Sequence, residues 1–337
     1  MKYLRFMPAV ASLLCMAAWT ASIPAWSAPA TATPPPAPAA PVSPAVSPEA
    51  AKVPDYVRIA EDAASTRLEV CVTTFTLPDG RNIDLFGVVH LADASYYKEL
   101  NRRLGTYDSV LFELVGNPEA LQNPNAAAAR PQGRPHPLRG IQKLIGDVFK
   151  LDFQLEKIDY TRPNFVHADT SAEEFAKMQA ERGESMMKLL LKSFQMSGDP
   201  ALQEKLKDAE NVGLADMIML FYSQKTMQRI KVIFARVLAE SESLLEDKLL
   251  GKDNAIVAGR NGVALKKLKE VMADPGKKRV AVFYGAGHMP TLEPVLTGEW
   301  KATRGEEAWL PAWTMPAPVK AAAPARDSAP ESAKPGV

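Results

Sequence analysis

Two short apolar runs constrain the fold of this chain more than any other feature of its sequence. Residues 108–115 read DSVLFELV and residues 279–284 read RVAVFY, so apolar side chains stand at consecutive rather than alternate positions. A strand with this pattern is apolar on both faces, and both faces must be covered. Such strands belong to parallel sheets with helices on either side, which indicates an α/β fold.

A β-hairpin is predicted ahead of the first run. Residues 67–77 are rich in Val, Thr and Phe, the sequence PDG at 78–80 is typical of a turn, and residues 82–89 form the returning strand. The sheet is therefore expected to begin with an antiparallel pair of strands.

The hairpin leads into a predicted β-α-β unit. A helix is expected from Asp93, a candidate N-cap, to Gly105, and the apolar strand 108–115 follows it. A unit of this kind is parallel. We therefore expect the strand that ends at His90 and the strand that holds Glu113 to lie close together.

The middle of the chain is predicted to be mostly helical. Residues 116–137, rich in Pro, Asn and Ala, are expected to form a long loop, and residues 165–168 a short strand. Ser171 and Glu174 form a capping-box pattern, and helical spacing of apolar residues continues to Met272. The predicted fold class is α/β, with a mostly parallel sheet, an N-terminal β-hairpin and a large helical insertion between two sheet-forming halves.

The ends of the chain differ in composition from its centre. Residues 1–28 have a positively charged start and an apolar core, as in a secretory signal peptide, and residues 29–51 are a Pro/Ala-rich linker. Residues 52–315 form the folded domain, and residues 316–337 are expected to be a disordered Ala/Pro-rich tail. We expect a periplasmic or secreted protein without a stable membrane span. A retained anchor is the alternative, although the apolar stretch is short for one.

The charge balance argues against a nucleic-acid partner. The chain has 40 Lys and Arg against 39 Asp and Glu, and loss of Lys2 and Arg5 with the leader lowers the formal net charge from +1 to −1. The sequence has no basic stripe with interleaved aromatic residues. Cys71 is the only cysteine outside the leader, which excludes an internal disulfide, and its apolar strand pattern predicts a buried thiol.

Two of the four histidines stand in matched settings. The sequence GVVH ends at His90 and closes the strand 82–89, whereas GAGH ends at His288 and closes the strand 279–284. In each motif a glycine allows a sharp exit from the strand. The histidine then stands just past the carboxyl end of the strand, where open α/β sheets bind their ligands. Both histidines are therefore candidate functional residues.

Three further polar residues interrupt apolar patterns. Glu113 lies within a buried strand, where a carboxylate needs a cation, a metal or good donors, or forms a purely structural ion pair. Arg260 lies on the apolar face of a helix beside Asn261, and its guanidinium is expected to pair with Glu113 or with an anionic substrate group. Asp169 either faces the same crevice or belongs to the start of the helix at Ser171. Arg260, Asn261 and Asp169 are the candidate substrate-binding residues.

These residues together resemble the TraB/GumN family, which includes the PrgY and Tiki proteins, within the erythromycin-esterase/ChaN-like superfamily. The resemblance is carried by GVVH, the Glu113 strand, ADTSAEEF at 168–175, GRN at 259–261 and VFYGAGHMP at 282–290. It covers nearly the whole folded domain and implies the α/β fold of that superfamily. Tiki-type relatives imply a metal-dependent protease that uses both GxxH histidines and a glutamate. One position departs from the pattern, because Arg260 stands where relatives often have an acidic residue.

The resulting prediction is an exported metal-dependent hydrolase, peptidase-like in its reaction. His90, Glu113 and His288 are the expected metal ligands and catalytic groups, and Arg260 is expected to orient the substrate or Glu113. Imidazole and carboxylate ligands suit Mn, Co, Zn and Fe. A divalent ion with an open position acidifies a bound water for attack on a peptide or small-molecule substrate.

Two other functions fit the same residues. A metal-free, esterase-like hydrolase would use His90 as general base, with His288 and Arg260 stabilising the oxyanion. A non-catalytic binding protein for a peptide or a haem-like ligand would use a pocket formed by the helical insertion and the loop 116–137. The sequence has no GxSxG, HExxH, P-loop or CxxC motif, which argues against the common serine hydrolases, zincins and nucleotide-binding enzymes.

Overall fold

The computed structural model describes residues 55–122, 137–184, 188, 216, 219–220, 222–244 and 254–317. The predicted signal peptide and linker lie outside the described residues, as does the predicted tail beyond residue 317. Within the described part of the chain, no helix combines the length and the apolarity that a membrane span requires.

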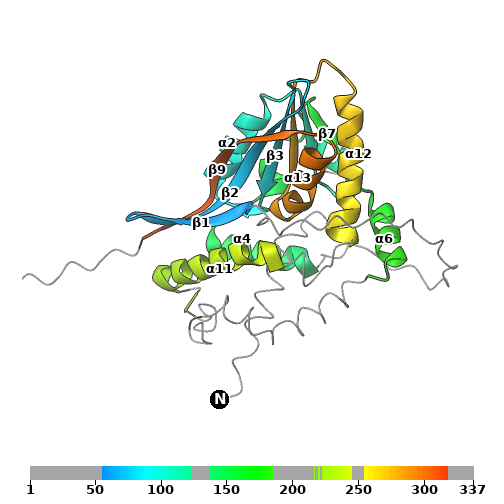
Figure 1. Cartoon of the computed structure of the whole chain (residues 1–337). Helices are drawn as coiled ribbons and strands as arrows, with labels where there is room; N and C mark the ends of the chain where they lie inside the picture. Colours follow the sequence, from blue (N-terminus) through cyan, green and yellow to red (C-terminus); the bar gives the residue numbers. More distant parts are fainter. Residues whose placement is uncertain are drawn as a thin grey trace, which may run out of the picture.

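The centre of the fold is a seven-stranded sheet covered by helices, which confirms the predicted α/β class (Figure 1). The strands of this sheet are β1 (Val57–Glu61), β2 (Ser65–Thr76), β3 (Asn82–Val88), β5 (Ser109–Phe112), β7 (Phe165–His167), β8 (Arg279–Gly285) and β9 (Thr303–Pro316). A separate two-stranded sheet pairs β4 (Leu91–Ala92) with β6 (Asp152–Phe153).

Parallel and antiparallel strands occupy different parts of the large sheet. Strands β3, β8, β5 and β7 lie side by side in that order, and each neighbouring pair is parallel. The long strand β2 is antiparallel to β1, β3 and β9. The predicted hairpin is confirmed as β2–β3. Its turn includes Gly80 at φ 84°, a left-handed conformation that glycine adopts without strain.

The His90 and Glu113 strands lie close together, as predicted, but they are not direct neighbours in the sheet. Strand β8, which leads to His288, lies between β3 and β5 and is parallel to both. The helix α2 (Ala94–Leu104) therefore connects two strands that are next-but-one neighbours. A β-α-β pattern fixes the direction of its strands but leaves open whether a later strand inserts between them.

Helices α12 (Arg260–Met272) and α13 (Met289–Gly298) cover one face of the parallel strands. Leu85 of β3 and Val282 of β8 face Leu268 of α12 and Leu292 of α13. The next residue along each strand points to the other face, where a row of aromatic rings crosses the sheet in register. That row consists of Phe86, Phe283 and Phe112.

Two predicted helix starts are found at the expected residues. The helix α2 begins after Asp93 and ends at Gly105, but the Asp93 carboxylate does not cap it and instead accepts hydrogen bonds from Lys231 and the Thr314 amide. The helix α6 (Ala172–Glu181) has a complete capping box between Ser171 and Glu174.

The helical insertion lies across one end of the sheet (Figure 1). Its described helices include α4 (Pro137–Phe149), α5 (Gln154–Lys157) and α11 (Gln224–Leu244). Phe149 of α4 and Phe234 of α11 pack on Trp313 of β9, with ring centroids 6.4 and 6.0 Å from the indole. The Trp313 Nε1 atom donates to the Leu91 carbonyl at 2.6 Å, so this aromatic cluster also holds the backbone next to His90.

Two sequence-based assignments need correction. The segment 116–137 is not a continuous loop, because it contains the short helix α3 (Glu119–Gln122) and ends at the first residue of α4; residues 123–136 lie outside the described residues. The strand β9 was not predicted. It contains Pro311, which cannot donate a ladder hydrogen bond, and it pairs with β2 through irregularities in register.

Candidate functional site

The candidate site lies at the carboxyl ends of three adjacent parallel strands. His90 follows β3, Glu113 follows β5, and His288 ends the 3-10 turn η4 (Ala286–His288) that follows β8. Because β8 lies between the other two strands, Gly285 at its end is central. A Cβ atom built on Gly285 would lie 3.3 Å from Glu113 Oε2, 3.7 Å from His288 Cδ2 and 3.8 Å from His90 Nε2. The three side chains thus meet around one point.

Glu113 is the most heavily engaged residue of the site. Its Oε2 atom accepts from the Gly285 amide at 2.7 Å, and its Oε1 atom accepts from Arg260 Nη2 at 2.6 Å. The Nε2 atom of His288 lies 3.6 Å from the same Oε1 atom. Burial opposes ionisation, but the Arg260 guanidinium, with contributions from His288 and His90, holds the pKa of Glu113 well below its usual range.

Arg260 lies between two buried carboxylates. Its Nε atom donates to Asp169 Oδ1 at 3.0 Å, and its Nη2 atom donates to Asp169 Oδ2 and to Glu113 Oε1. Burial opposes the guanidinium charge, yet Asp169 and Glu113 hold the pKa of Arg260 above its ordinary value. Three of the five guanidinium hydrogens are thus committed to protein carboxylates. This arrangement favours an organising role for Arg260 over direct contact with an oxyanion.

A π-helical turn, η3 (Ala255–Gly259), precedes Arg260 and Asn261. The Asn254 side chain accepts from the Val257 amide at 2.6 Å, and the Glu184 carboxylate accepts from the Ala255 amide at 3.1 Å. Two consecutive residues at the start of α12 are then both buried and face the site: Arg260 contacts Glu113, and Asn261 contacts His288. π-Helical turns are often found at functional sites.

The formal charges of the site do not balance. Arg260 contributes one positive charge, whereas Glu113 and Asp169 contribute two negative charges when both are ionised. All three side chains are at least 99 % buried. An uncompensated charge is costly in such surroundings, so the site favours a compensating positive charge.

The structure brings all six of the predicted site residues together. His90, Glu113 and His288 surround Gly285, Arg260 and Asp169 form the ion cluster behind Glu113, and Asn261 contacts the His288 ring. Asp169 pairs with Arg260 rather than capping α6, where Ser171 is the N-cap. The Asn261 carboxamide is engaged with His288 and Thr291, so its polar atoms are used within the protein.

Two residues of the site were not predicted from the sequence. Gln154 contacts Nδ1 of His90 at 2.9 Å, because the β4–β6 pairing brings residue 153 opposite Leu91. Tyr284 packs edge-on against the His288 ring with centroids 5.2 Å apart, and its hydroxyl donates to the Ala168 carbonyl. A buried glutamine in a polar segment has no sequence signal. The run VFYG around Tyr284 indicates only an apolar strand.

The donor types suit a first-row divalent ion, but their arrangement does not close around one. Two imidazoles and a carboxylate are appropriate ligands, and His288 Nε2 and Glu113 Oε1 are 3.6 Å apart. Among the residues that the structure describes, however, no group of three or more His, Cys, Asp or Glu is placed to hold a metal ion. Both Glu113 oxygens already accept hydrogen bonds. Metal binding at His90, Glu113 and His288 would therefore require these side chains to move.

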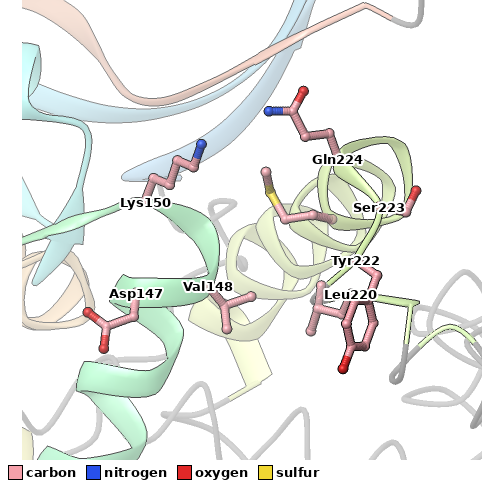
Figure 2. Close-up of a pocket in the computed structure, with 8 residues that line it drawn as sticks. Asp147, Val148, Lys150, Leu220, Tyr222, Ser223 and Gln224 are labelled. Carbon is pink, nitrogen blue, oxygen red and sulfur yellow. The ribbon is translucent and has the colours of Figure 1, made fainter.

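A pocket lies away from this centre, in the helical layer. It has a volume of about 350 Å³ and lies between the end of α4 and the start of α11 (Figure 2). Lys150, Ser223 and Gln224 are polar residues of its lining, whereas Leu220 and Met227 are apolar. None of its lining residues belongs to the His90–Glu113–His288 centre.

Comparison of the chain with protein-family models, with curated proteins and with solved structures finds no match.

Proposed function

We propose that this chain is an exported hydrolase of the TraB/GumN type, whose reaction centre consists of His90, Glu113 and His288. The observation that carries the proposal is the meeting of these three buried side chains around Gly285, from segments nearly 200 residues apart. Carboxyl ends of parallel strands are where α/β proteins place their reactive groups. The substrates that suit such a centre are carbonyl compounds, in a peptide or a small ester.

The residues present divide the work of hydrolysis between them. His90 is assigned as the base that takes a proton from the attacking water. His288, in its protonated form, is assigned as the acid that gives a proton to the leaving amine or alkoxide as its bond to the carbonyl carbon breaks. Glu113, kept ionised by Arg260, favours the protonated state of either ring during the reaction. General acid–base catalysis of this kind contributes roughly 10²- to 10⁴-fold in rate.

A divalent ion is a second form of the same proposal. Mn, Co, Zn or Fe bound to His90, Glu113 and His288 would supply an acidified water and polarise the substrate carbonyl. The donor types support this form, whereas the present spacing and the Arg260–Glu113 contact favour the form without metal.

The test is hydrolysis of a panel of fluorogenic peptides and esters by the mature chain, first with a chelator and then with each ion added. We expect His90→Ala and Glu113→Gln to lose turnover by at least ~10²-fold. His167→Gln serves as the matched control, because the His167 ring contacts the Leu114 carbonyl rather than the centre. Turnover that survives in His90→Ala would remove the proposed centre, and dependence on one added ion would select the metal-bound form.

A binding protein for a peptide or a haem-like ligand is the other candidate, and the pocket between α4 and α11 favours it. Its test is native mass spectrometry of the protein as purified. A bound ligand that is retained in His90→Ala and lost in Met227→Trp, together with no turnover of any substrate, would support the binding protein instead.

A further inference from the structure

Both imidazoles of the centre are held by a carboxamide at Nδ1. Asn261 Oδ1 lies 2.7 Å from Nδ1 of His288, and Gln154 Oε1 lies 2.9 Å from Nδ1 of His90. All four side chains are buried. A carboxamide presents to a ring either its oxygen, which accepts, or its NH₂ group, which donates, and the two choices require opposite tautomers of a neutral imidazole. The orientation of each amide therefore decides which ring nitrogen carries the proton.

The contacts of Asn261 leave only one orientation. Its Nδ2 atom lies 3.1 Å from the His288 carbonyl oxygen, which can only accept. Nδ2 also contacts Thr291 Oγ1, whose own hydrogen is donated to the same carbonyl at 3.0 Å. A flipped amide would place its oxygen against two acceptors. The Oδ1 atom must therefore face the ring, so the neutral His288 ring carries its proton on Nδ1.

Gln154 adopts the equivalent orientation at His90. Its Nε2 atom donates to the Tyr160 hydroxyl at 3.0 Å, and its Oε1 atom faces Nδ1 of His90 at 2.9 Å. The Gln154 backbone amide also donates to the His90 carbonyl at 2.9 Å, and β4 pairs with β6 beside it. Backbone and side chain of the two residues are thus fixed relative to each other.

We propose that Asn261 and Gln154 are positioning residues that hold both neutral imidazoles with the proton on Nδ1. Each Nε2 atom is then the basic one: that of His288 lies 3.6 Å from Glu113 Oε1, and that of His90 lies beside Gly285. The two rings therefore present the same atom, with a lone pair, beside Glu113 and Gly285, where it can take a proton. The catalytic meaning of this arrangement rests on the proposed function, whereas the tautomers do not.

His167 provides an internal reference of the opposite kind. Its Nε2 atom lies 2.7 Å from the Leu114 carbonyl oxygen, an acceptor only, so this ring carries its proton on Nε2. One spectrum of the protein should therefore contain both tautomers. The His90 and His288 rings should carry the proton on Nδ1, and the His167 ring should carry it on Nε2.

The test is a long-range ¹H–¹⁵N correlation spectrum of the ¹⁵N-labelled mature chain, metal-free, at about pH 9, above the ordinary pKa of histidine. His90→Asn, His167→Asn and His288→Asn assign the rings. We expect a protonated Nδ1 in His90 and His288 and a protonated Nε2 in His167. A neutral His90 or His288 ring with its proton on Nε2 would overturn the proposal.

Substitution of Asn261 tests its role directly. In Asn261→Leu, the His288 ring is expected to lose its single tautomer and to show a mixture. Thr291→Val is the matched control, because it touches the same amide but not the ring. An unchanged His288 tautomer in a folded Asn261→Leu variant contradicts the role of Asn261.

The activity readout is separate. If the chain turns over a substrate, Asn261→Leu should lower kcat by roughly 10- to 100-fold and leave KM within about twofold, as loss of a partner that orients a reactive ring does. If the chain turns over none, the proposed function fails, while the spectrum still decides the tautomers.

Discussion

The two ends of the parallel strands each pair an arginine with a buried carboxylate, yet the surroundings of the two pairs differ. At the carboxyl end Arg260 contacts Glu113 and Asp169, and its side chain is only 1 % exposed. At the amino end Arg279 contacts Asp84 at 2.9 Å, and its side chain is 49 % exposed. Water reaches the Arg279 guanidinium at the amino end, although Asp84 itself is buried, whereas it is excluded from all three side chains of the carboxyl-end cluster.

The two ends also differ in composition, and the carboxyl end is the one that holds the proposed reaction centre. At the amino end one cation meets one carboxylate, and Tyr107 donates to the same Asp84 oxygen, so the cluster joins β3, β8 and the segment before β5. At the carboxyl end one cation meets two carboxylates and two imidazoles lie beside them. A buried ion cluster is often no more stabilising than apolar residues of similar volume. The carboxyl end therefore has a composition that stability alone does not require.

Removal of Arg260 should produce the largest effect. Arg260→Met leaves Glu113 and Asp169 buried without their cation, and we expect a loss of about 3–5 kcal/mol in the free energy of unfolding. Urea denaturation followed by circular dichroism measures it. Arg260→Lys, which keeps the charge but loses the fork of donors, should fall between Arg260→Met and the unchanged chain. A loss below about 1 kcal/mol in Arg260→Met would show that the two ends are energetically alike.

The residues of the carboxyl-end cluster could be predicted from the sequence, whereas those of the amino-end pair could not, and the reasons are physical. Glu113 and Arg260 can be recognised because each interrupts an apolar pattern. His90 and His288 can be recognised because each ends a GxxH motif at the end of a predicted strand. Asp84 also lies in an apolar strand, but it does not stand out, because one acidic residue near a strand start is common.

The parts that could not be predicted depend on which segments pair. The insertion of β8 between β3 and β5, the return of β9 along β2 and the contact of Gln154 with His90 all join segments distant in sequence. Local patterns indicate which elements form and which face is apolar. They do not specify which other strand or segment an element will pair with.

A single methyl group added at Gly285 tests whether the reaction depends on the positions of the three side chains around it. In Gly285→Ala the new Cβ would lie 3.3 Å from Glu113 Oε2 and within 4 Å of both histidines, and the backbone at φ −51° tolerates alanine. We expect turnover to fall by up to about 100-fold, the effect of misplacing reacting groups by a fraction of an ångström to about 1 Å. Unfolding free energy should change by less than about 1 kcal/mol.

Gly298→Ala is the control for that substitution, because a methyl group added at Gly298 would have no atom within 4 Å. It should leave both turnover and stability unchanged. Full turnover in Gly285→Ala would mean that the reaction does not use the space around Gly285.

At the amino end, Arg279→Met should cost much less than Arg260→Met. The Arg279 side chain is about half exposed, so solvent screening reduces its contribution, and we expect a loss of about 1 kcal/mol that shrinks further with added salt. Turnover should stay at the level of the unchanged chain. Equal losses of turnover in the Arg279 and Arg260 variants would remove the functional distinction between the two ends.

The smallest expected effect is on how the free energy of unfolding falls at alkaline pH. Burial, with the hydrogen bond and charge of Asp84, raises the pKa of Tyr107 above its ordinary value. Because the pKa is higher in the folded state, the Tyr107 hydroxyl keeps its proton there at a pH at which the unfolded chain has lost it. The contribution is complete below about pH 10 and is lost as pH rises beyond it, by at most about 1.4 kcal/mol per pH unit for one proton.

Tyr107→Phe should therefore flatten the fall in stability above about pH 10, measured by urea unfolding at several pH values. Tyr222→Phe, at a residue that is 82 % exposed, should not change that slope. If both variants lose stability with pH as steeply as the unchanged chain, the amino-end cluster does not sense alkaline pH, and its Tyr107–Asp84 contact is not maintained in solution.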